Sequence, residues 1–514
     1  MLNFADANRH WPNALGLPAH LMTNPFPANA GSFSTAAEAA FGPQAKRYAL
    51  REIARRAGVT AEFFATWRIE TSHDATIVHI GSDSGRVISF PAAPQEFWNE
   101  LTAGKFRIGQ PLWPLGRPDQ TGAAQVPRPI VPFVPETVTG DEQPLFAIRN
   151  SKFAVCNLDL LLSTLLTLSR FEETLSGQRD FYGRFPATEG VAFREGFLGR
   201  PIVDEYGLAL QQTLEALLPG WKPLPRFLRA MVTHDVDNVG LPFSFRPTVG
   251  HVARRWNPSA ALRDLAATVS PLDPAYLHAV RRVVTTASRR GLKSSVFWKA
   301  GPSGPMDSGY DLRHPKIRRT IEWLADRGVE QGVHPGFETF RHPEKLRAEV
   351  NLVREAVGDQ VVGGRQHYLR WCPDTWAQWE DCGLAYDSSV GFADHVGFRA
   401  GTCHPYRPWS LSEGRELNII EIPLIAMEVT LTGYMDLGVN KSVQIVKDLV
   451  DKCRLMGGVF TFLYHNDSIL DLRYDGLYER VLDQITGTEA FDWRSVRTYC
   501  LINGKSKTTE LETA

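Results

Sequence analysis

The sequence predicts an α/β protein built from a (β/α) barrel over residues 221–505 and a smaller N-terminal α/β domain over residues 1–220. The chain of 514 residues is too long for one ordinary hydrophobic core. After residue 226, strand patterns alternate with helix patterns, which is typical of a parallel sheet. Seven or eight such units within about 290 residues fit a barrel better than a small open sheet.

The N-terminal domain mixes helix and strand patterns. The segment 36–58 predicts a helix that ends at Gly58, because glycine commonly follows the last helical turn. Three segments have strand character, and Gly81 and Gly85 are the expected turn residues between the last two. These segments are residues 60–69, 75–81 and 86–92.

Later segments show where the chain divides. Residues 111–140 are rich in proline, which predicts an extended or irregular stretch. Residues 157–177 have a strongly apolar helix pattern with Asp159 near its start. Proline and glycine then cluster at residues 217–227, where we place the domain boundary. At the other end, residues 506–514 are expected to form a polar tail.

The barrel pattern is regular, and a glycine marks the end of each predicted helix. The helix patterns cover residues 274–291, 315–328, 343–358, 375–383 and 441–457. The strand patterns cover residues 226–233, 292–300, 328–334, 360–368, 384–392, 418–427 and 458–465, with a weaker one at 496–502.

Composition argues against several classes of partner. With Lys+Arg 56 and Asp+Glu 57, the chain has no electrostatic basis for binding nucleic acid or an acidic membrane surface. The amino terminus shows no charged leader before an apolar core, and no apolar run is long enough to cross a membrane. The six cysteines contain no CxxC pair, as expected for reduced thiols in a cytoplasmic protein.

Polar and charged side chains gather where the barrel strands are expected to end. The segment THDVD at residues 233–237 closes the first strand pattern with two carboxylates. Because the carboxyl ends of parallel barrel strands meet at one face, these residues should converge on one pocket. They are Asp235, Asp237, His334, Arg365, His367, Asp387 and His465.

These residue types suit hydrolysis of an amide, which needs an activated water, stabilisation of the oxyanion and an acid for the leaving amine. The i, i+2 spacing puts Asp235 and Asp237 on one side of an extended chain, so one can bind a metal while the other accepts a proton. His465 can approach from the opposite side as the acid, whereas His234 should point away and be structural. Each aspartate alone could also be a turn or cap residue.

The motifs resemble those of the polysaccharide deacetylase family, carbohydrate esterase family four, over about residues 226–505. The segment THDVD is similar to the family's first motif, which implies that Asp235 is the general base and Asp237 a metal ligand. The segment EQGVH is similar to the second motif and implies that His334 is a ligand. The resemblance also implies a distorted barrel of the polysaccharide-deacetylase type.

Two further motifs carry the resemblance. The segment RQHY is similar to the third motif, so Arg365 would orient the base and the backbone at Tyr368 would help to bind the oxyanion, although His367 replaces a proline. The segment FLYHND is similar to the last motif and implies that His465 is the acid. Residues 169–206 also resemble a bacterial two-domain subgroup whose N-terminal domain is uncharacterised.

One position departs from the family pattern. The second histidine of an HxxxH motif is expected four residues after His334, where this chain has Glu338. We favour His367 as the replacement ligand, because it shares a strand face with Arg365, and keep Glu338 and His342 as alternatives, together with a weak or absent metal site. A divalent metal is expected, with Zn²⁺ the first choice for an Asp/His set.

One more loop, GFRAGTCHPYRPW, combines arginine with aromatic residues. Its Arg399, Tyr406 and Trp409 could bind a sugar and an anionic group, or could form a packed loop with paired arginines.

The leading hypothesis is a metal-dependent hydrolase that removes an acetyl or formyl group from a sugar in surface polysaccharide metabolism. The alternatives are a decayed deacetylase barrel that binds sugar or acts as a scaffold, and a metal-independent C–N hydrolase. The N-terminal domain is expected to pack on the barrel, shape the cleft or form an oligomer contact.

Overall fold

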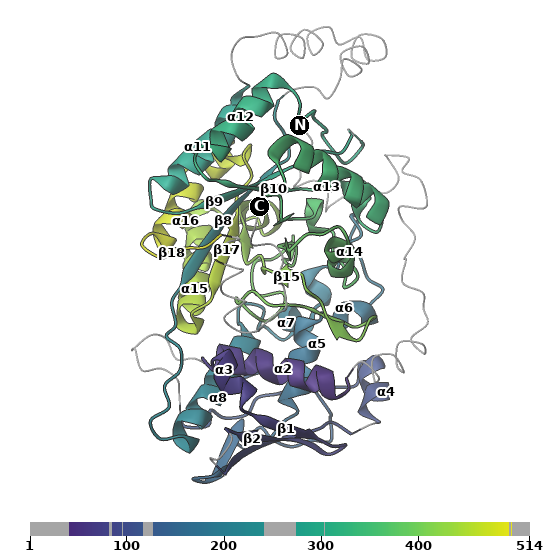
Figure 1. Ribbon diagram of the computed structural model, residues 1–514, viewed down its shortest axis with the longest axis vertical. Helices are drawn as coiled ribbons and strands as arrows, with labels where there is room; N and C mark the ends of the chain where they lie inside the picture. Colours follow the sequence, from purple (N-terminus) through teal and green to yellow (C-terminus); the bar gives the residue numbers. More distant parts are fainter. Residues whose placement is uncertain are drawn as a thin grey trace.

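The computed structural model describes residues 41–81, 85–94, 96–116, 127–240, 274–302, 304–492 and 495. The weak strand pattern at 496–502, the polar tail and the absence of a leader sequence were predicted for segments outside these residues. Figure 1 shows an N-terminal α/β domain at the bottom and a second domain with a curled parallel sheet above it. Within the described ranges, no helix combines the length and apolar character needed to cross a membrane.

The upper sheet has nine parallel strands, and eight of them form the barrel in the order in which they follow along the chain. β8 pairs with β9 on one side and with β17 on the other, so the first and last strands of the series are neighbours. The eight are β8 (Arg229–Val236), β9 (Ser294–Trp298), β10 (Glu330–Val333), β11 (Gly363–Gly364), β12 (Tyr386–Asp387), β15 (Ile420–Glu421), β16 (Ala426–Met427) and β17 (Val459–Leu463). This order confirms the predicted (β/α) barrel class.

The barrel is distorted between β15 and β16, which do not pair with each other. The four residues that link these two strands form backbone hydrogen bonds to β12 on one side and to β17 on the other. Ile422 N donates to Asp387 O at 2.8 Å, and Ile425 N donates to Thr461 O at 3.2 Å. Four strands are only two residues long, so the predicted strand segments around them are mostly loop.

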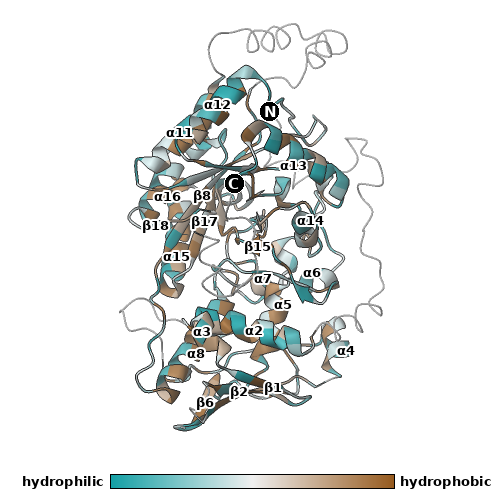
Figure 2. Ribbon diagram, in the orientation of Figure 1, coloured by the Kyte–Doolittle hydropathy of each residue, from teal (hydrophilic) through white to brown (hydrophobic). Residues whose placement is uncertain are grey.

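Helices follow the strands as predicted and pack on the outside of the sheet. Figure 2 shows hydrophobic β8 and β17, whereas α11 and α12 carry many hydrophilic residues. Near-continuous apolar strands are expected where both faces of a parallel sheet are covered. The helices are α11 (Ala275–Ser288), α12 (Pro315–Ala325), α13 (Pro343–Val357), α14 (Thr375–Asp381), α15 (Val439–Met456) and α16 (Leu477–Ile485), the last of which was not predicted.

The N-terminal domain contains a five-stranded sheet in the order β1-β2-β3-β7-β6. Figure 1 shows α2, α5 and α8 between this sheet and the barrel. The strands are β1 (Arg68–Thr71), β2 (Ala75–Ile80), β3 (Arg86–Pro91), β6 (Phe146–Asn150) and β7 (Phe153–Cys156). The main helices are α2 (Pro43–Arg56), α4 (Phe97–Thr102), α5 (Leu160–Leu168) and α8 (Ile202–Leu217). Two short antiparallel ladders complete the structure, β4 (Arg107–Gly109) with β5 (Val131–Val134) and β13 (Trp409–Ser410) with β14 (Arg415–Glu416), and β18 (Glu489–Ala490) pairs with β8.

Two predicted elements in this domain were wrong. Residues 61–65 form helix α3 instead of a strand, because the hydroxyl of Thr60 caps the helix by accepting from Phe63 N at 3.2 Å. The apolar helix predicted over residues 157–177 stops at Leu168 and resumes as α6 (Glu172–Leu175), because Arg170 has a φ of 56° and cannot continue a helix.

Gly364 shows how closely the barrel strands approach. A Cβ at this position would lie 1.8 Å from the carbonyl oxygen of Val333 on β10, and backbone on a paired strand cannot move aside cheaply. We therefore expect Gly364→Ala to lower the free energy of unfolding by about 3 kcal/mol or more. Gly304→Ala is the control, because a Cβ there meets nothing within 4 Å. Equal denaturation midpoints for the two variants would contradict this account.

Candidate metal centre and active site

Four predicted site residues converge at the carboxyl face of the barrel. Asp237 Oδ1 lies 3.1 Å from His334 Nε2 and 3.2 Å from His367 Nε2. The other carboxylate oxygen of Asp237 lies 3.7 Å from His465 Nε2. One side-chain atom from each of Asp237, His334 and His367 lies within 4.8 Å of the others, which is a spacing suited to a shared cation.

The Nδ1 atom of each of the two histidines is held by an oxygen. His334 Nδ1 lies 2.7 Å from Arg365 O, and His367 Nδ1 lies 2.8 Å from Asp307 Oδ1. These oxygens only accept, so each Nδ1 carries a proton, and the Nε2 atom of each ring faces Asp237. A carboxylate oxygen with two imidazole Nε2 atoms at 3.1 and 3.2 Å needs a positive charge beside it, which a ring proton or a bound cation can supply. The donor set therefore fits a divalent metal ion.

The charges in this cluster depend strongly on one another. Burial disfavours ionised Asp237, but the imidazoles of His367 and His334 hold its pKa well below the usual range. Burial likewise opposes a charged His367, and the carboxylate of Asp237 outweighs it, so the pKa of this ring is raised. Asp237 is accordingly a carboxylate available for coordination.

Asp235 lies beside the metal-binding cluster and is held by a fully buried arginine. Arg365 Nη1 donates to Asp235 Oδ1 at 3.0 Å and to the hydroxyl of Thr233 at 2.8 Å. Its other nitrogens donate to Ser388 O at 2.8 Å and to Ser388 Oγ at 2.9 Å. Asp235 Oδ2 lies 3.6 Å from His334 Nδ1, so both aspartates of THDVD approach the same imidazole.

His234 points to the other side of the strand, as the alternation of an extended chain requires. Strand β8 continues to Val236, so His234 and Asp235 lie inside the strand. The prediction that Asp235 follows the strand was wrong. His234 Nδ1 lies 2.8 Å from Tyr464 O, and burial lowers the pKa of its ring to about 4. A neutral, packed histidine agrees with the structural interpretation.

His465 is oriented by a buried glutamate that the sequence did not indicate. Glu428 Oε1 lies 2.7 Å from His465 Nδ1 and also accepts from the backbone N of His465 and the hydroxyl of Ser468. Burial lowers the pKa of this histidine, but Glu428 outweighs it and raises the pKa to about 10. His465 is thereby held protonated, with Nε2 directed at the cluster.

A second missed pair supports His367. Lys299, at the end of β9, places its Nζ 2.7 Å from Asp307 Oδ1, the same oxygen that accepts from the imidazole. The other oxygen of Asp307 accepts from Phe337 N at 2.9 Å. Burial raises the pKa of this carboxyl, but His367 and Lys299 lower it further, so Asp307 is ionised. In the sequence, the only sign of this pair is that Lys299 stands at the end of a predicted strand.

The alternative ligands lie outside the cluster. Glu338 Oε2 is 3.5 Å from Lys345 Nζ and half exposed. His342 Nδ1 is 3.4 Å from Glu344 Oε1, also on the surface. Of the three candidates for the missing ligand, the structure brings His367 alone next to Asp237.

Tyr368 lies in a strained turn next to the cluster. Its φ is 59° and that of Leu369 is 55°, which are uncommon for residues with side chains. The ring of Tyr368 packs on His367 with centroids 4.3 Å apart, and its carbonyl accepts from Arg184 at 3.1 Å. Its role in binding the oxyanion stays a prediction.

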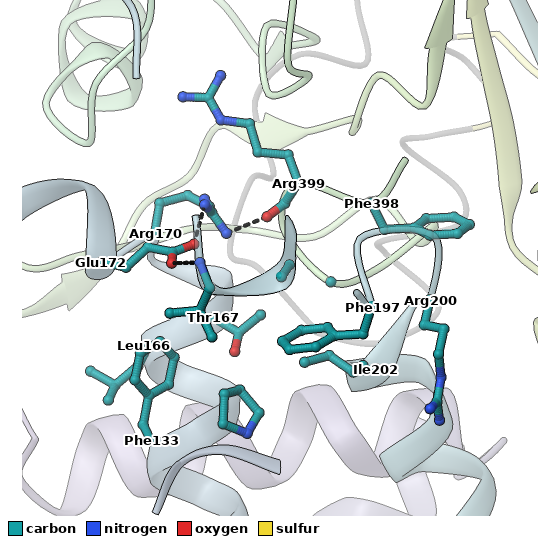
Figure 3. Close-up of a pocket in the computed structure, with 14 residues that line it drawn as sticks. Phe133, Leu166, Thr167, Arg170, Glu172, Phe197, Arg200, Ile202, Phe398 and Arg399 are labelled. Atoms are coloured by element: carbon teal, nitrogen blue, oxygen red, sulfur yellow. Dashed lines mark hydrogen bonds and ion pairs between the residues drawn. The ribbon is translucent and has the colours of Figure 1, made fainter. Parts of the chain in front are cut away.

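The three residues predicted to bind substrate lie elsewhere, in the contact with the N-terminal domain. Arg399 Nη2 is 2.6 Å from Glu173 Oε2, and its carbonyl accepts from Arg170 (Figure 3). Tyr406 donates its hydroxyl to Leu168 O at 2.9 Å, and Trp409 packs on the Tyr48 ring.

The cavity in Figure 3 holds about 20 Å³, enough for a water but not for a sugar. The other domain covers this loop, so Arg399, Tyr406 and Trp409 form interdomain contacts and not the predicted substrate site.

Known proteins resemble this chain in two parts. A family of unknown function, DUF7033, matches residues 118–219, and no curated protein sequence matches. A structure named as a polysaccharide deacetylase from Mycobacterium smegmatis is 15% identical, with 55% of this chain and 93% of that chain covered and a TM-score of 0.39. A family 4 carbohydrate esterase from Streptomyces lividans in complex with acetate is 9% identical, with 51% and 92% covered and a TM-score of 0.28.

A third structure is named as a polysaccharide deacetylase involved in O-antigen biosynthesis from Bordetella bronchiseptica. It is 15% identical, with 53% of this chain and 89% of that chain covered and a TM-score of 0.27. Similarity at this level assigns no chemistry to the chain. Any chemical role has to be argued from the residues described above.

The buried Arg365–Asp235 pair should be costly to break. Replacing the arginine leaves a carboxylate buried without its cation, so Arg365→Met is expected to lower the unfolding free energy by about 3–5 kcal/mol. Arg473→Met is the control, because its ion pair with Asp471 is exposed and should contribute less than about 1 kcal/mol. Chemical denaturation measures both, and similar losses would contradict the role of burial.

Proposed function

We propose that the chain is a divalent-metal-dependent hydrolase that removes an N-acyl group, acetyl or formyl, from a sugar or sugar-containing intermediate. The observation that carries the proposal is the convergence of Asp237, His334 and His367, with Asp235 close to His334 and His465 close to Asp237. One carboxylate and two imidazoles leave coordination positions for water and substrate, as in catalytic rather than structural sites.

Asp237, His334 and His367 would hold the metal. When bound, a divalent ion would polarise the amide carbonyl and lower the pKa of a water molecule. Zn²⁺ is the first choice for these nitrogen and oxygen donors, and the set also suits other first-row divalent ions.

The remaining residues have complementary roles in proton transfer. Arg365 occupies one oxygen of Asp235, which leaves the other on the side of the cluster to accept a proton from the attacking water. As the C–N bond breaks, His465 would give its Nε2 proton to the leaving amine. Glu428 keeps this ring in position and protonated beforehand. The backbone at Tyr368 is proposed to stabilise the oxyanion.

One of the two sequence-based alternatives loses part of its motivation. The decayed-barrel hypothesis rested on the glutamate at position 338, but His367, 3.2 Å from Asp237, would supply a nitrogen donor in its place. A metal-independent C–N hydrolase would use the same acidic residues without a cation. Its activity would survive chelation, whereas that of a metal-dependent hydrolase would not. A cytoplasmic location and a step in surface polysaccharide metabolism remain proposals drawn from the sequence.

The central test combines metal content with hydrolysis. The purified protein should contain about one equivalent of divalent metal and release acetate or formate from N-acylated amino sugars. Asp235→Asn should keep the metal and lose at least about 100-fold in kcat, whereas Asp237→Ala should lose both metal and activity. Elemental analysis and a coupled acetate assay provide the two readouts.

Activity that survives prolonged chelation would replace the metal mechanism with the metal-independent one. Full metal content and full rate in both aspartate variants would refute the proposed site.

The Asp307–His367 bond leads to a separate expectation about metal affinity. Asp307→Asn should weaken zinc binding by about 10–100-fold, because the carboxylate fixes the ring and increases the basicity of Nε2. Glu338→Gln is a matched control at the position where the family pattern places a ligand, and it should leave the affinity unchanged. Competition with a chromophoric chelator measures both, and a larger effect of Glu338→Gln would reverse the ligand assignment.

A further inference from the structure

A loop of the N-terminal domain, residues 178–186, reaches the candidate active site. Arg184 in this loop is buried and donates to the carbonyl of Tyr368 and to the hydroxyl of Tyr434, each at 3.1 Å. Asp180 holds the loop itself, accepting from the backbone N of Tyr182 and of Arg184 at 2.9 Å and pairing with the Arg184 guanidinium at 2.7 Å. The loop is therefore fixed in place against the residues beside His367.

Aromatic rings run outward from the metal-binding cluster along this loop. The ring of Tyr182 stacks on Tyr368 with centroids 4.9 Å apart and an interplanar angle of 28°, and Tyr368 in turn packs on His367. Phe181 continues the row, with its ring 5.2 Å from that of Tyr182. Phe181 is 57% exposed, so its ring is accessible to a ligand.

We propose that Tyr182 and Phe181 form a subsite for the saccharide unit adjacent to the one that is deacylated. This inference rests on the proposed function and deepens it, because it makes the substrate an oligosaccharide rather than a single sugar. The apolar face of a sugar ring packs on an aromatic ring, and a tyrosine hydroxyl adds a hydrogen bond at the edge. Both residues belong to the stretch matched by the family of unknown function, which would thereby contribute to substrate binding.

The charged side chains around the loop are engaged in contacts within the protein. Arg184 and Asp180 are paired with each other, and Arg370, beside Gly183, lies over the Phe337 ring and donates to the Phe337 carbonyl. An anionic group such as the diphosphate of a nucleotide-linked sugar would compete with these contacts for a cation, whereas a neutral glycan chain would leave them in place.

The test measures binding in the full, metal-loaded chain carrying Asp235→Asn, which prevents turnover. Chitotetraose, a chain of four N-acetylglucosamine units, is the probe in isothermal titration calorimetry, with N-acetylglucosamine as the short comparison. Tyr182→Ala and Phe181→Ala should each raise the Kd of chitotetraose at least about ten-fold. Phe181→Ala should leave the Kd of N-acetylglucosamine and the metal content unchanged.

Phe227→Ala is the matched control. Phe227 is 55% exposed, but it precedes the amino end of β8, whereas Asp235 lies near the carboxyl end of that strand. Equal Kd values for Phe181→Ala and Phe227→Ala, or no binding of chitotetraose to the parent protein, would overturn the subsite. Tighter, Tyr182-dependent binding of UDP-N-acetylglucosamine would also overturn it in favour of a nucleotide-linked substrate.

Tyr182→Phe separates binding from support of the turn at Tyr368. Because it keeps the stacked ring, it should retain most of the affinity and the melting temperature of the parent. If Tyr182→Ala instead lowers metal affinity and chitotetraose affinity together, the residue only positions His367 and the subsite is refuted. Should binding follow the expected pattern while the wild-type chain releases no acetate or formate, the subsite stands and the hydrolase proposal fails.

Discussion

The carboxyl face of the barrel is organised around one carboxylate, Asp237, on which three imidazoles converge. Such a cluster is stable only if every neighbouring charge has a partner, because isolated charges are costly inside a protein. The structure meets this condition with buried acids that each face a cation. The pairs are Asp235 with Arg365, Asp307 with Lys299, and Glu428 with His465.

The same constraint joins the two domains. Glu173 lies between the guanidinium groups of Arg170 and Arg399, and its pKa is lowered by them although burial raises it. Asp204 on α8 accepts from Arg56 and from the hydroxyl of Thr402 in the barrel loop. Separating the domains would leave these buried charges exposed or unpaired, so the N-terminal domain holds a defined position on the barrel and can present a loop to the active site.

The fold and the inner part of the site were predictable because they depend on patterns within short segments. Buried strands and glycine-ended helices repeat along the chain, and strand ends of parallel sheets share one face. The supporting residues Asp307 and Glu428 could not be predicted, since their importance arises from contacts between distant segments. For the same reason the sequence could not show that the loop of Arg399 faces the other domain. Four barrel strands were also predicted too long, because pairing there is limited to two residues.

Strand geometry explains how the chain can have Glu338 where the family pattern places a histidine. β10 and β11 are neighbours, with Val333 paired to Gly364, so residues just beyond these two strands reach the same point above the sheet. A nitrogen ligand can therefore come from position 367 on the second strand instead of position 338 in the loop of the first. A histidine there needs its own acceptor, and Asp307 supplies it while Lys299 balances the added charge. Moving the ligand thus requires a linked set of residues, which is why the departure from the family pattern cannot be judged from position 338 alone.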